Sequence, residues 1–304
     1  MARRGQRTCL RVAGPVHGRA VTSHGTAVPR LAGAASICIM VFATAAGAQS
    51  RTDTGPGLPS ADCGLKGDVS GKVTSVVDGE TVVLSTGETV RLIGFKAPAA
   101  PLSPTGVRIW PPAALAKAAL AALVLNHKVT ARFGGTRTDR RGRLLAQLFV
   151  TDLAERVWVQ RYLLERGLGR AYSFRDNYAC IAELLRREAL ARTARRGIWG
   201  GSRYRILRAD APRTLGRLIN SFQLVEGRVR KVTVLSRRTY LNFGDDWRRD
   251  FTVSIARKDR ALFEADGIDP AKLEGRRVRV RGWLRWINGP AIEMTHPGQL
   301  EVLE

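Results

Sequence analysis

The feature that most constrains this fold is the alternation of apolar and polar residues between Gly71 and Phe95. The pair Asp78-Gly79 and the pair Thr86-Gly87 interrupt the alternation. A period of two places the apolar side chains on one face of a strand, and such pairs favour tight turns. The segment therefore predicts consecutive strands that are connected by tight turns.

The sequence after this segment predicts helices and two further strands. The first helix is rich in Ala and Leu and carries Pro112 near its first turn. The two later helices have apolar residues at three- and four-residue spacings. The predicted elements are a helix at 113–128, strands at 129–135 and 143–151, and helices at 157–172 and 180–199. We expect an α+β, mostly β domain at residues 70–200, in which helices pack on a small barrel.

A second unit is predicted at residues 218–304, after a linker at 201–217. Five short strand-like runs with one intervening helix suit a small barrel of the oligonucleotide- and oligosaccharide-binding (OB) type. The strands are predicted at 222–235, 239–244, 250–257, 277–287 and 291–294, and the helix at 258–267.

The N-terminus is typical of a secretory signal. Arginines precede the apolar run Leu31–Ala48, which ends in small residues, and the predicted cut follows Ala48. The alternative is an uncleaved membrane anchor, for which the run is short and rich in Ala and Gly. We expect a signal peptide at 1–48, a flexible leader at 49–69, export to the periplasm or beyond, and no stable membrane span after cleavage.

Cysteine usage agrees with export. Cys9 and Cys38 lie in the predicted signal, so Cys63 and Cys180 remain. Two thiols in an exported chain favour a disulfide, although two unrelated thiols are the alternative. Only His127 and His296 follow the signal, and no Cys or His cluster has zinc spacing.

The charge favours an anionic partner. The chain has a formal net charge of +24 at pH 7, and a field of that sign attracts phosphate polymers and anionic surfaces. The alternative is that the whole proteome is rich in arginine, which would give the same net charge without any anionic partner. The charge alone does not decide between these two explanations.

One predicted strand of the second unit also carries a concentration of positive charge. In residues 276–286 the period of two places Val278, Val280 and Leu284 on one face. Arginines and one tryptophan share the other face, which suits phosphate pairing and base stacking. An arginine-decorated solvent face is the alternative. The nucleic-acid contacts expected on this face are Arg279, Arg281 and Trp283.

Three motifs in the first unit resemble those of the staphylococcal nuclease (thermonuclease) family: VVDGETVVL at 76–84, RLIGFKAP at 91–98 and RTDRRGR at 137–143. The stretches LLERGLGRAY at 163–172 and RRGIW at 195–199 also resemble its C-terminal helices. The resemblance covers residues 70–200. It implies a five-stranded OB barrel with three helices that cleaves DNA and RNA phosphodiesters with a calcium ion.

The resemblance implies a phosphate clamp that is intact. Arg91 and Arg143 match the family's two phosphate-binding arginines, whose forked donors stabilise charge in the transition state. Tyr172 matches an aromatic residue that stacks on a base, with helix-end packing as the alternative. We expect Arg140 and Arg141 to form a basic rim, and Asp139 to shape its own loop through an Asx turn.

The metal and water machinery departs from the family pattern. Glu80 stands at a metal-binding Asp, Lys96 at the second metal carboxylate, and Ala99 at the catalytic Glu. Calcium prefers several oxygen ligands, and an ammonium group nearby repels it. Losing the general base typically lowers the rate by about 10²–10⁴. Glu80 is therefore a weak metal ligand, and Lys96 adds to an anion-seeking pocket.

These observations predict an exported protein that binds nucleic acid, DNA or RNA, or another polyanion, with weak or absent hydrolysis and no required cofactor. One alternative is an active calcium-dependent endonuclease with ligands recruited from elsewhere. A second alternative is a non-catalytic scaffold in the cell envelope, because OB barrels accept many ligands.

Overall fold

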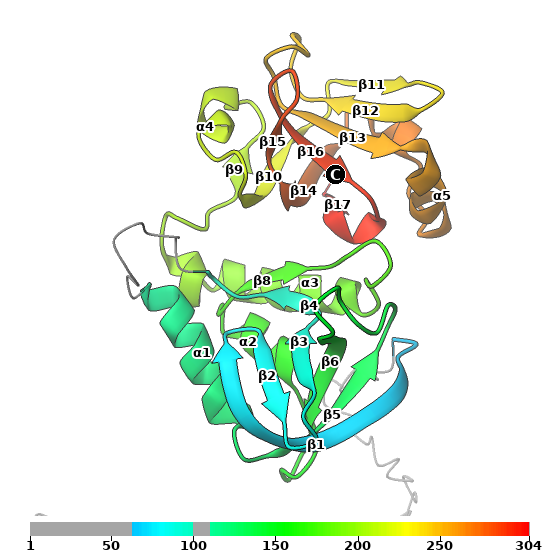
Figure 1. Ribbon diagram of the computed structural model, residues 1–304. Helices are drawn as coiled ribbons and strands as arrows, with labels where there is room; N and C mark the ends of the chain where they lie inside the picture. Colours follow the sequence, from blue (N-terminus) through cyan, green and yellow to red (C-terminus); the bar gives the residue numbers. More distant parts are fainter. Residues whose placement is uncertain (1–62, 100–109, 304) are drawn as a thin grey trace, which may run out of the picture. The chain divides into compact units, whose positions relative to one another are not determined.

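The computed structural model describes residues 63–99 and 110–303. The predicted signal at 1–48 and most of the predicted leader at 49–69 lie outside the described residues. The described chain belongs to one compact unit that contains two β-barrels (Figure 1). None of its described helices is long and apolar enough to cross a membrane.

Five strands of the first half form a closed barrel. The long strand β1 pairs with β2 through its second half and with β5 through its first half, both antiparallel. The barrel closes where β3 runs parallel to β6. This pairing order is that of an OB barrel, as the sequence predicts. The strands are β1 Lys66–Asp78, β2 Thr81–Leu84, β3 Thr89–Leu92, β5 Lys128–Phe133 and β6 Leu144–Val150.

Three helices and three short strands surround this barrel. Helix α1 packs against β1, and α2 packs against both β6 and α3. Strand β4 pairs antiparallel with β8 outside the barrel, and β7 pairs antiparallel with the end of β6. These elements are α1 Pro111–Val124, α2 Val159–Glu165, α3 Ile181–Thr193, β4 Gly94–Lys96, β7 Val157–Trp158, β8 Arg170–Tyr172 and a 3₁₀ turn at Gly197–Gly200.

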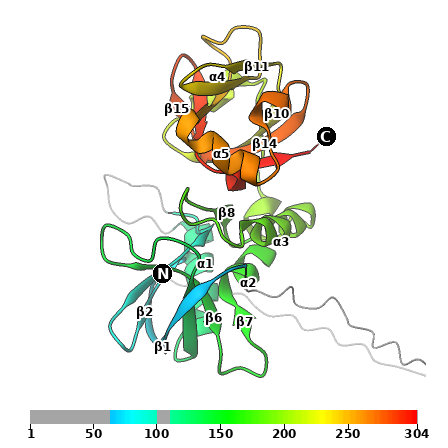
Figure 2. The ribbon, with the colours of Figure 1, turned by 90° about the vertical axis from the view of Figure 1, so that its right-hand side faces the viewer.

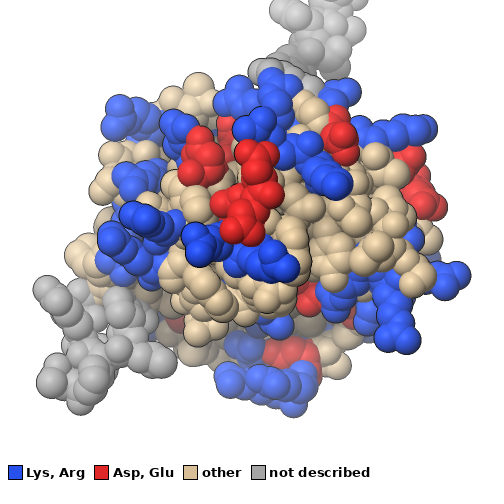
Figure 3. Space-filling view, turned by 90° about the horizontal axis from the view of Figure 1, so that it is seen from above, with Lys and Arg blue, Asp and Glu red and all other residues tan. Residues whose placement is uncertain are grey.

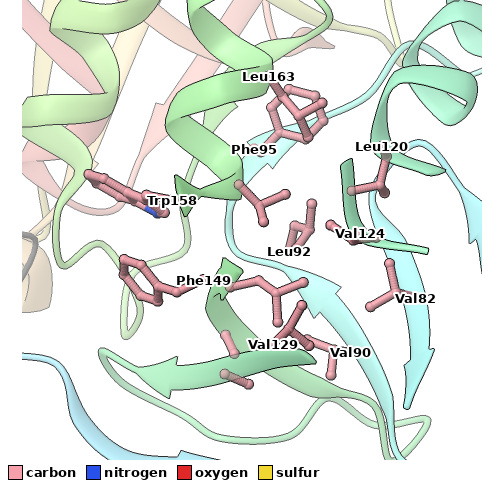
Figure 4. Close-up of a cluster of buried hydrophobic side chains, with 14 of the residues drawn as sticks. Val82, Val90, Leu92, Phe95, Leu120, Val124, Val129, Phe149, Trp158 and Leu163 are labelled. Carbon is pink, nitrogen blue, oxygen red and sulfur yellow. The ribbon is translucent and has the colours of Figure 1, made fainter. Parts of the chain in front are cut away.

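Apolar side chains from strands and helices meet inside the barrel, as Figure 4 shows. The alternation in β2 and β3 directs Val82, Val90 and Leu92 inward, where each is at most 1% exposed. Leu120 of α1 and Leu163 of α2 close the core from outside the strands. The helices therefore hold the barrel wall, including β3, which carries Arg91, and β6, which Arg143 directly precedes.

All three helices predicted in this domain are shorter than expected, and α3 ends at Thr193 instead of residue 199. Residues 125–128 leave the helix after Val124, because Asn126 adopts a left-handed φ of 66°. Residues 166–172 form a turn and strand β8 instead of helix. Gly167 has φ of 66°, and a Cβ there would lie 2.2 Å from the carbonyl oxygen of Arg196. Only glycine permits this approach, so α2 stops there.

The second barrel has the same pairing order as the first. Its first strand is interrupted into β10 and β11, and its fourth into β14 and β15, while the remaining strands are continuous. β13 runs parallel to β16, as β3 does to β6, and the other neighbours are antiparallel. The strands are β10 Phe222–Arg228, β11 Lys231–Val234, β12 Arg238–Asn242, β13 Thr252–Ala256, β14 Arg277–Trp283, β15 Arg285–Trp286 and β16 Pro290–Met294.

A helix follows the third strand in both barrels: α1 in the first and α5, Arg257–Ala265, in the second. Figure 2 shows the second set of strands as a ring with α5 beside it. Strand β17, Leu300–Val302, pairs with β14, and two 3₁₀ turns occupy Pro270–Leu273 and Pro297–Gln299. The OB-like fold expected for residues 218–304 agrees with this topology.

The second half of the expected linker is part of the second barrel. Strand β9, Leu207–Arg208, pairs parallel with β10, and helix α4, Pro212–Gly216, follows it. Leu207, Ala209 and Leu215 are buried in the second core. Apolar residues spaced through a basic stretch explain why composition alone suggested a linker.

Ion pairs and hydrogen bonds join the two barrels. Arg281 of β14 has its side chain 2% exposed and lies 2.9 Å from Glu188 of α3 and 2.6 Å from Glu301. It also donates to the carbonyl oxygen of Ala171. Arg175 pairs with the buried Asp259 of α5. These contacts fix the β8 segment against the second barrel.

A buried histidine lies at the same junction. The Nε2 of His296 is 2.8 Å from the hydroxyl oxygen of Ser173, and the ring packs near Tyr178. Burial lowers the pKa of His296 to about 4, although Asp259 and Asp176 oppose the shift. The native protein therefore holds a neutral imidazole at neutral pH.

A disulfide joins Cys63, just before β1, to Cys180 at the start of α3. The two cysteines are separated by 117 residues. The bond pairs the two thiols that the sequence analysis expected to pair, and it ties the first strand of the barrel to the last helix of the domain.

We expect Cys63→Ser with Cys180→Ser to lower the free energy of unfolding by about 2–5 kcal/mol, because the disulfide restricts a long loop in the unfolded chain. Chemical denaturation with and without reductant measures the difference. Reductant should destabilise the wild type and leave the double variant unchanged. Equal stability of the two proteins under oxidising conditions would contradict the prediction.

We expect the folded protein to lose stability as the pH falls from about 6.5 to about 4. In this window the unfolded chain binds a proton at His296 that the native chain does not, so the loss reaches at most about 3 kcal/mol. His296→Gln should remove this part of the slope in thermal melts. His127→Gln, at a half-buried histidine, should retain it. A slope that is the same in both variants would refute the assignment.

Candidate nucleic-acid interface

The first hairpin fixes Glu80 beside Arg91. Residues 78–81 form the turn between β1 and β2, where the amide of Glu80 donates to the carboxylate of Asp78. Gly79 is required there, because a Cβ would lie 2.8 Å from that of Ala97. The Oε1 of Glu80 lies 3.3 Å from a guanidinium nitrogen of Arg91, and its Oε2 accepts from the amide of Ala97 at 2.8 Å. Both carboxylate oxygens are therefore engaged within the protein.

The parallel pairing of β3 with β6 brings Arg91 and Arg143 together. Arg91 lies opposite Leu145, two residues after Arg143. Both arginines line one cavity of about 470 Å³, and their side chains are 20% and 22% exposed. We call this space the arginine cavity. It is lined by Arg91, Thr136, Thr138, Asp139, Arg140, Arg141, Arg143, Leu145, Phe174 and Asp176.

Asp139 shapes the loop that carries three of these arginines. Its carboxylate accepts from the amides of Arg141 and Arg143 and from the Arg143 guanidinium. Burial would raise the pKa of Asp139, but these hydrogen bonds outweigh it and lower the pKa. The Asx turn expected at Asp139 is confirmed, and the carboxylate orients Arg143.

A close backbone approach holds this loop against the segment after β8. A Cβ at Gly135 would lie 1.8 Å from the carbonyl oxygen of Asp176, so only glycine fits. Asn177 donates to the carbonyl oxygen of Thr136, and the Thr136 hydroxyl donates to Asp176. Phe174 consequently lies at the cavity, with its ring 5.7 Å from the Arg91 guanidinium carbon.

The cavity has excess positive charge. Arg91, Arg140, Arg141 and Arg143 face two aspartates, of which Asp139 is engaged by Arg143. Among the described residues, the side chains of Arg140 and Arg141 make no ion pair. Basic side chains are also widespread elsewhere on the molecule, and Figure 3 shows them around the acidic side chains on one face. Forked guanidinium donors in such a cavity suit a phosphate group.

Lys96 lies close enough to Arg91 to interact with it, and its ammonium group is near two aromatic rings. Its ammonium nitrogen is 5.6 Å from the ring centre of Tyr172 and 5.7 Å from that of Trp283. Burial lowers the pKa of Lys96, the carboxylate of Glu80 opposes this shift, and Arg91 adds to it. Lys96, Tyr172 and Trp283 were each predicted separately to contact nucleic acid. They lie close together in the structure, although Trp283 belongs to the second barrel and the other two to the first domain.

A calcium ion, which the resemblance implies, does not fit these residues. Both oxygens of Glu80 are engaged, Asp78 caps the turn, and the ammonium of Lys96 is close enough to Glu80 to interact with it. In the described part of the chain, no three Asp, Glu, His or Cys residues are grouped as a metal site. Calcium requires several oxygen ligands, which this geometry does not supply.

The arginine face predicted on β14 requires a correction. The period of two is right, but Arg281 is buried and its guanidinium is held by Glu188, Glu301 and Ala171, so it cannot act as a surface contact for phosphate. Arg279 is 13% exposed and pairs with Glu226 and Glu301. Trp283 remains 43% exposed at the end of the strand.

Sequence reasoning missed Phe174 and Asp176, which line the arginine cavity. The signal for Phe174 was available, because it follows Tyr172 by two residues, and Tyr172 packs edge-on against it at 5.0 Å. Asp176 had no comparable signal, since its position depends on the approach of Gly135.

We expect millimolar calcium to leave the melting temperature of the wild type unchanged. Lys96→Asp with Ala99→Glu removes the ammonium and adds two carboxylates, so calcium should stabilise that variant. Thermal melts across a calcium series, at constant ionic strength, measure both. Lys96→Met with Ala99→Gln is the neutral control. The conclusion that calcium does not fit this site would be contradicted if calcium stabilised the wild type saturably and Glu80→Gln abolished that stabilisation.

Comparison with known proteins covers the same region. Residues 89–201 match the model of the staphylococcal nuclease homologue family. No curated protein matches the chain. The match runs from β3 past the turn at Gly197–Gly200 and includes Arg91, Arg143 and Tyr172. The family binds nucleic acid and in general depends on calcium. The chain thus contains a staphylococcal nuclease homologue domain at residues 89–201.

Proposed function

We propose that this protein binds the phosphodiester backbone of nucleic acid through the arginine cavity, with weak or absent hydrolysis. The observation that carries the proposal is the contrast between the two halves of the site. Arg91 and Arg143 line one cavity. In contrast, both carboxylate oxygens of Glu80 accept hydrogen bonds from the protein, and the ammonium group of Lys96 lies near Glu80.

The hydrogen bonding of Glu80 supports the view that the site no longer binds calcium but still binds phosphate. Arg91 meets one carboxylate, Glu80, and retains further guanidinium donors for a ligand. Arg143 is likewise oriented by Asp139. The ion-paired arginines are pre-organised, so less side-chain entropy is lost when a phosphate binds.

The lack of a carboxyl side chain at Ala99 supports weak hydrolysis. A general base must lie within hydrogen-bond reach of the attacking water, and a methyl group accepts no proton. Near the arginine cavity Asp139 is engaged by Arg143 and Asp176 by Thr136. An active calcium-dependent nuclease would need carboxylates that these contacts occupy.

Export is part of the proposal. A disulfide between Cys63 and Cys180 is typical of oxidising compartments, and it supports the N-terminal signal predicted from sequence. Cell fractionation followed by N-terminal sequencing of the mature chain tests this: a cut after Ala48 is expected, and an uncut cytosolic chain would reject it.

We expect Arg91→Ala and Arg143→Ala each to weaken binding of a single-stranded oligonucleotide by about tenfold, because each removes charged hydrogen bonds to phosphate. Fluorescence anisotropy measures the affinity. Arg156→Ala is the matched control, since Arg156 is exposed and lines none of the cavities described here. Equal affinity of all four proteins would reject the proposal.

Two further measurements, a salt and calcium series of the affinity and a nucleotide-release assay, separate binding from hydrolysis. Affinity should fall steeply with salt, with a slope of about −0.7 per phosphate contacted, and should not change when calcium is chelated. Release of acid-soluble nucleotides should stay at background. Calcium-dependent release by the wild type would instead establish the active nuclease.

A further inference from the structure

We propose that single-stranded nucleic acid lies along a row of three adjoining cavities, which begins at the arginine cavity and continues across the second barrel to Trp286. This inference rests on the proposed function, since it extends the path of the same ligand. The partner it names is an unpaired strand whose bases are free to stack.

The first step is that the cavities adjoin. The arginine cavity and a middle cavity of about 340 Å³ share Phe174 and Asp176 in their walls. The middle cavity and a third cavity of about 590 Å³ share Trp283 and Arg285. We call the third one the tryptophan cavity. The shared residues place the cavities next to one another, and we infer that a strand leaving one cavity enters the next.

The second step is that both barrels build the middle cavity. One wall is Tyr172 and Phe174 from the β8 segment, and another is Phe222 and Trp283 from the second barrel. Tyr172 packs edge-on against Phe222 at 5.1 Å. The ion pairs of Arg281 hold these walls together. Aromatic walls with polar groups between them suit a nucleobase.

The third step is the chemistry of the tryptophan cavity. Trp286 is 63% exposed and Trp283 is 43% exposed, with Arg285 between them in sequence. Among the described residues, Arg285 makes no ion pair. Exposed tryptophans beside an unpaired guanidinium combine base stacking with phosphate attraction, which is the pattern of single-strand binding.

The fourth step is that Trp286 is held in place. Its ring lies close to Gly216 of α4, where a Cβ would be 3.1 Å from the ring carbon Cζ3. Backbone pairing of Trp286 with Pro290 fixes the strand below it. A platform that is already ordered loses little entropy when a base stacks on it.

The charge along the row favours an unpaired strand over an acidic protein. Arginines stand at both ends, in the arginine cavity and at Arg285. In the middle cavity the carboxylate of Glu293 is neutralised by Arg238, and Asp176 is hydrogen-bonded to Thr136. The lining arginines Arg175 and Arg281 are themselves paired with carboxylates outside the cavity lining. The middle is therefore aromatic and hydrogen-bonding, where a base fits better than a carboxylate.

The test uses the full chain with fluorescent oligothymidylates of about 3 and about 15 nucleotides, below and near the upper end of site sizes for one OB barrel. The short oligonucleotide reaches the arginine cavity, and the long one spans the row. Trp286→Ala should weaken binding of the long oligonucleotide by about 5- to 50-fold, the loss of one stacked base. It should leave the short oligonucleotide unaffected.

Matched variants distinguish the two proposals. Trp247→Ala removes another exposed tryptophan, which lines none of the three cavities, and should leave both affinities unchanged. Arg91→Ala should weaken both oligonucleotides. If the wild type binds neither, the proposed function fails. If it binds both equally, or if Trp286→Ala has no effect on the long one, only the path across the second barrel is overturned.

Duplex and polyphosphate probes complete the test. The expected result is that a duplex of the long oligonucleotide, and inorganic polyphosphate of equal charge, bind more weakly and are indifferent to Trp286→Ala. A loss of duplex or polyphosphate affinity equal to that for the single strand would overturn the stacking role. Circular dichroism of each variant confirms that the fold is retained.

Discussion

The arrangement of the whole described chain depends on the buried guanidinium of Arg281. It belongs to the second barrel, yet it is neutralised by Glu188 of the first domain and by Glu301 of its own. Breaking a buried pair of this kind typically costs about 3–5 kcal/mol, because an uncompensated charge remains. The pair therefore specifies one packing of the two barrels, and with it the proximity of Trp283 to Lys96 and Tyr172.

The nuclease-like site shows a second consequence of charge pairing. A carboxylate can either bind a cation or accept hydrogen bonds from the protein, and Glu80 does the latter with both oxygens. The positive charge that a bound ion would supply is then available from side chains, namely Lys96 and the arginines. Positive side chains at such a site suit a phosphate group without any bound ion, and this is the basis on which we propose binding with weak or absent hydrolysis.

Much of this could be predicted from the sequence, because it depends on local patterns. Alternation in residues 71–95 and 222–294 predicts the strands, and Asp139 predicts its own turn. The error at Arg281 has a different origin. Period two shows that Arg281 and Trp283 share a face, but whether that face meets solvent depends on Glu188, which lies far away in sequence. Likewise, the ends of α1 and α2 depend on Asn126 and Gly167, whose backbone angles the helical spacing does not reveal.

The parallel closure of both barrels has a consequence for how copies of this chain behave when they are crowded together. In each barrel the third and fifth strands pair, so the main-chain donors and acceptors of the wall face one another. Open sheet edges recruit strands from other molecules, whereas a ring offers few such templates. A basic protein built from two such rings can therefore lie close to other copies of itself with little tendency to join them through β-sheet.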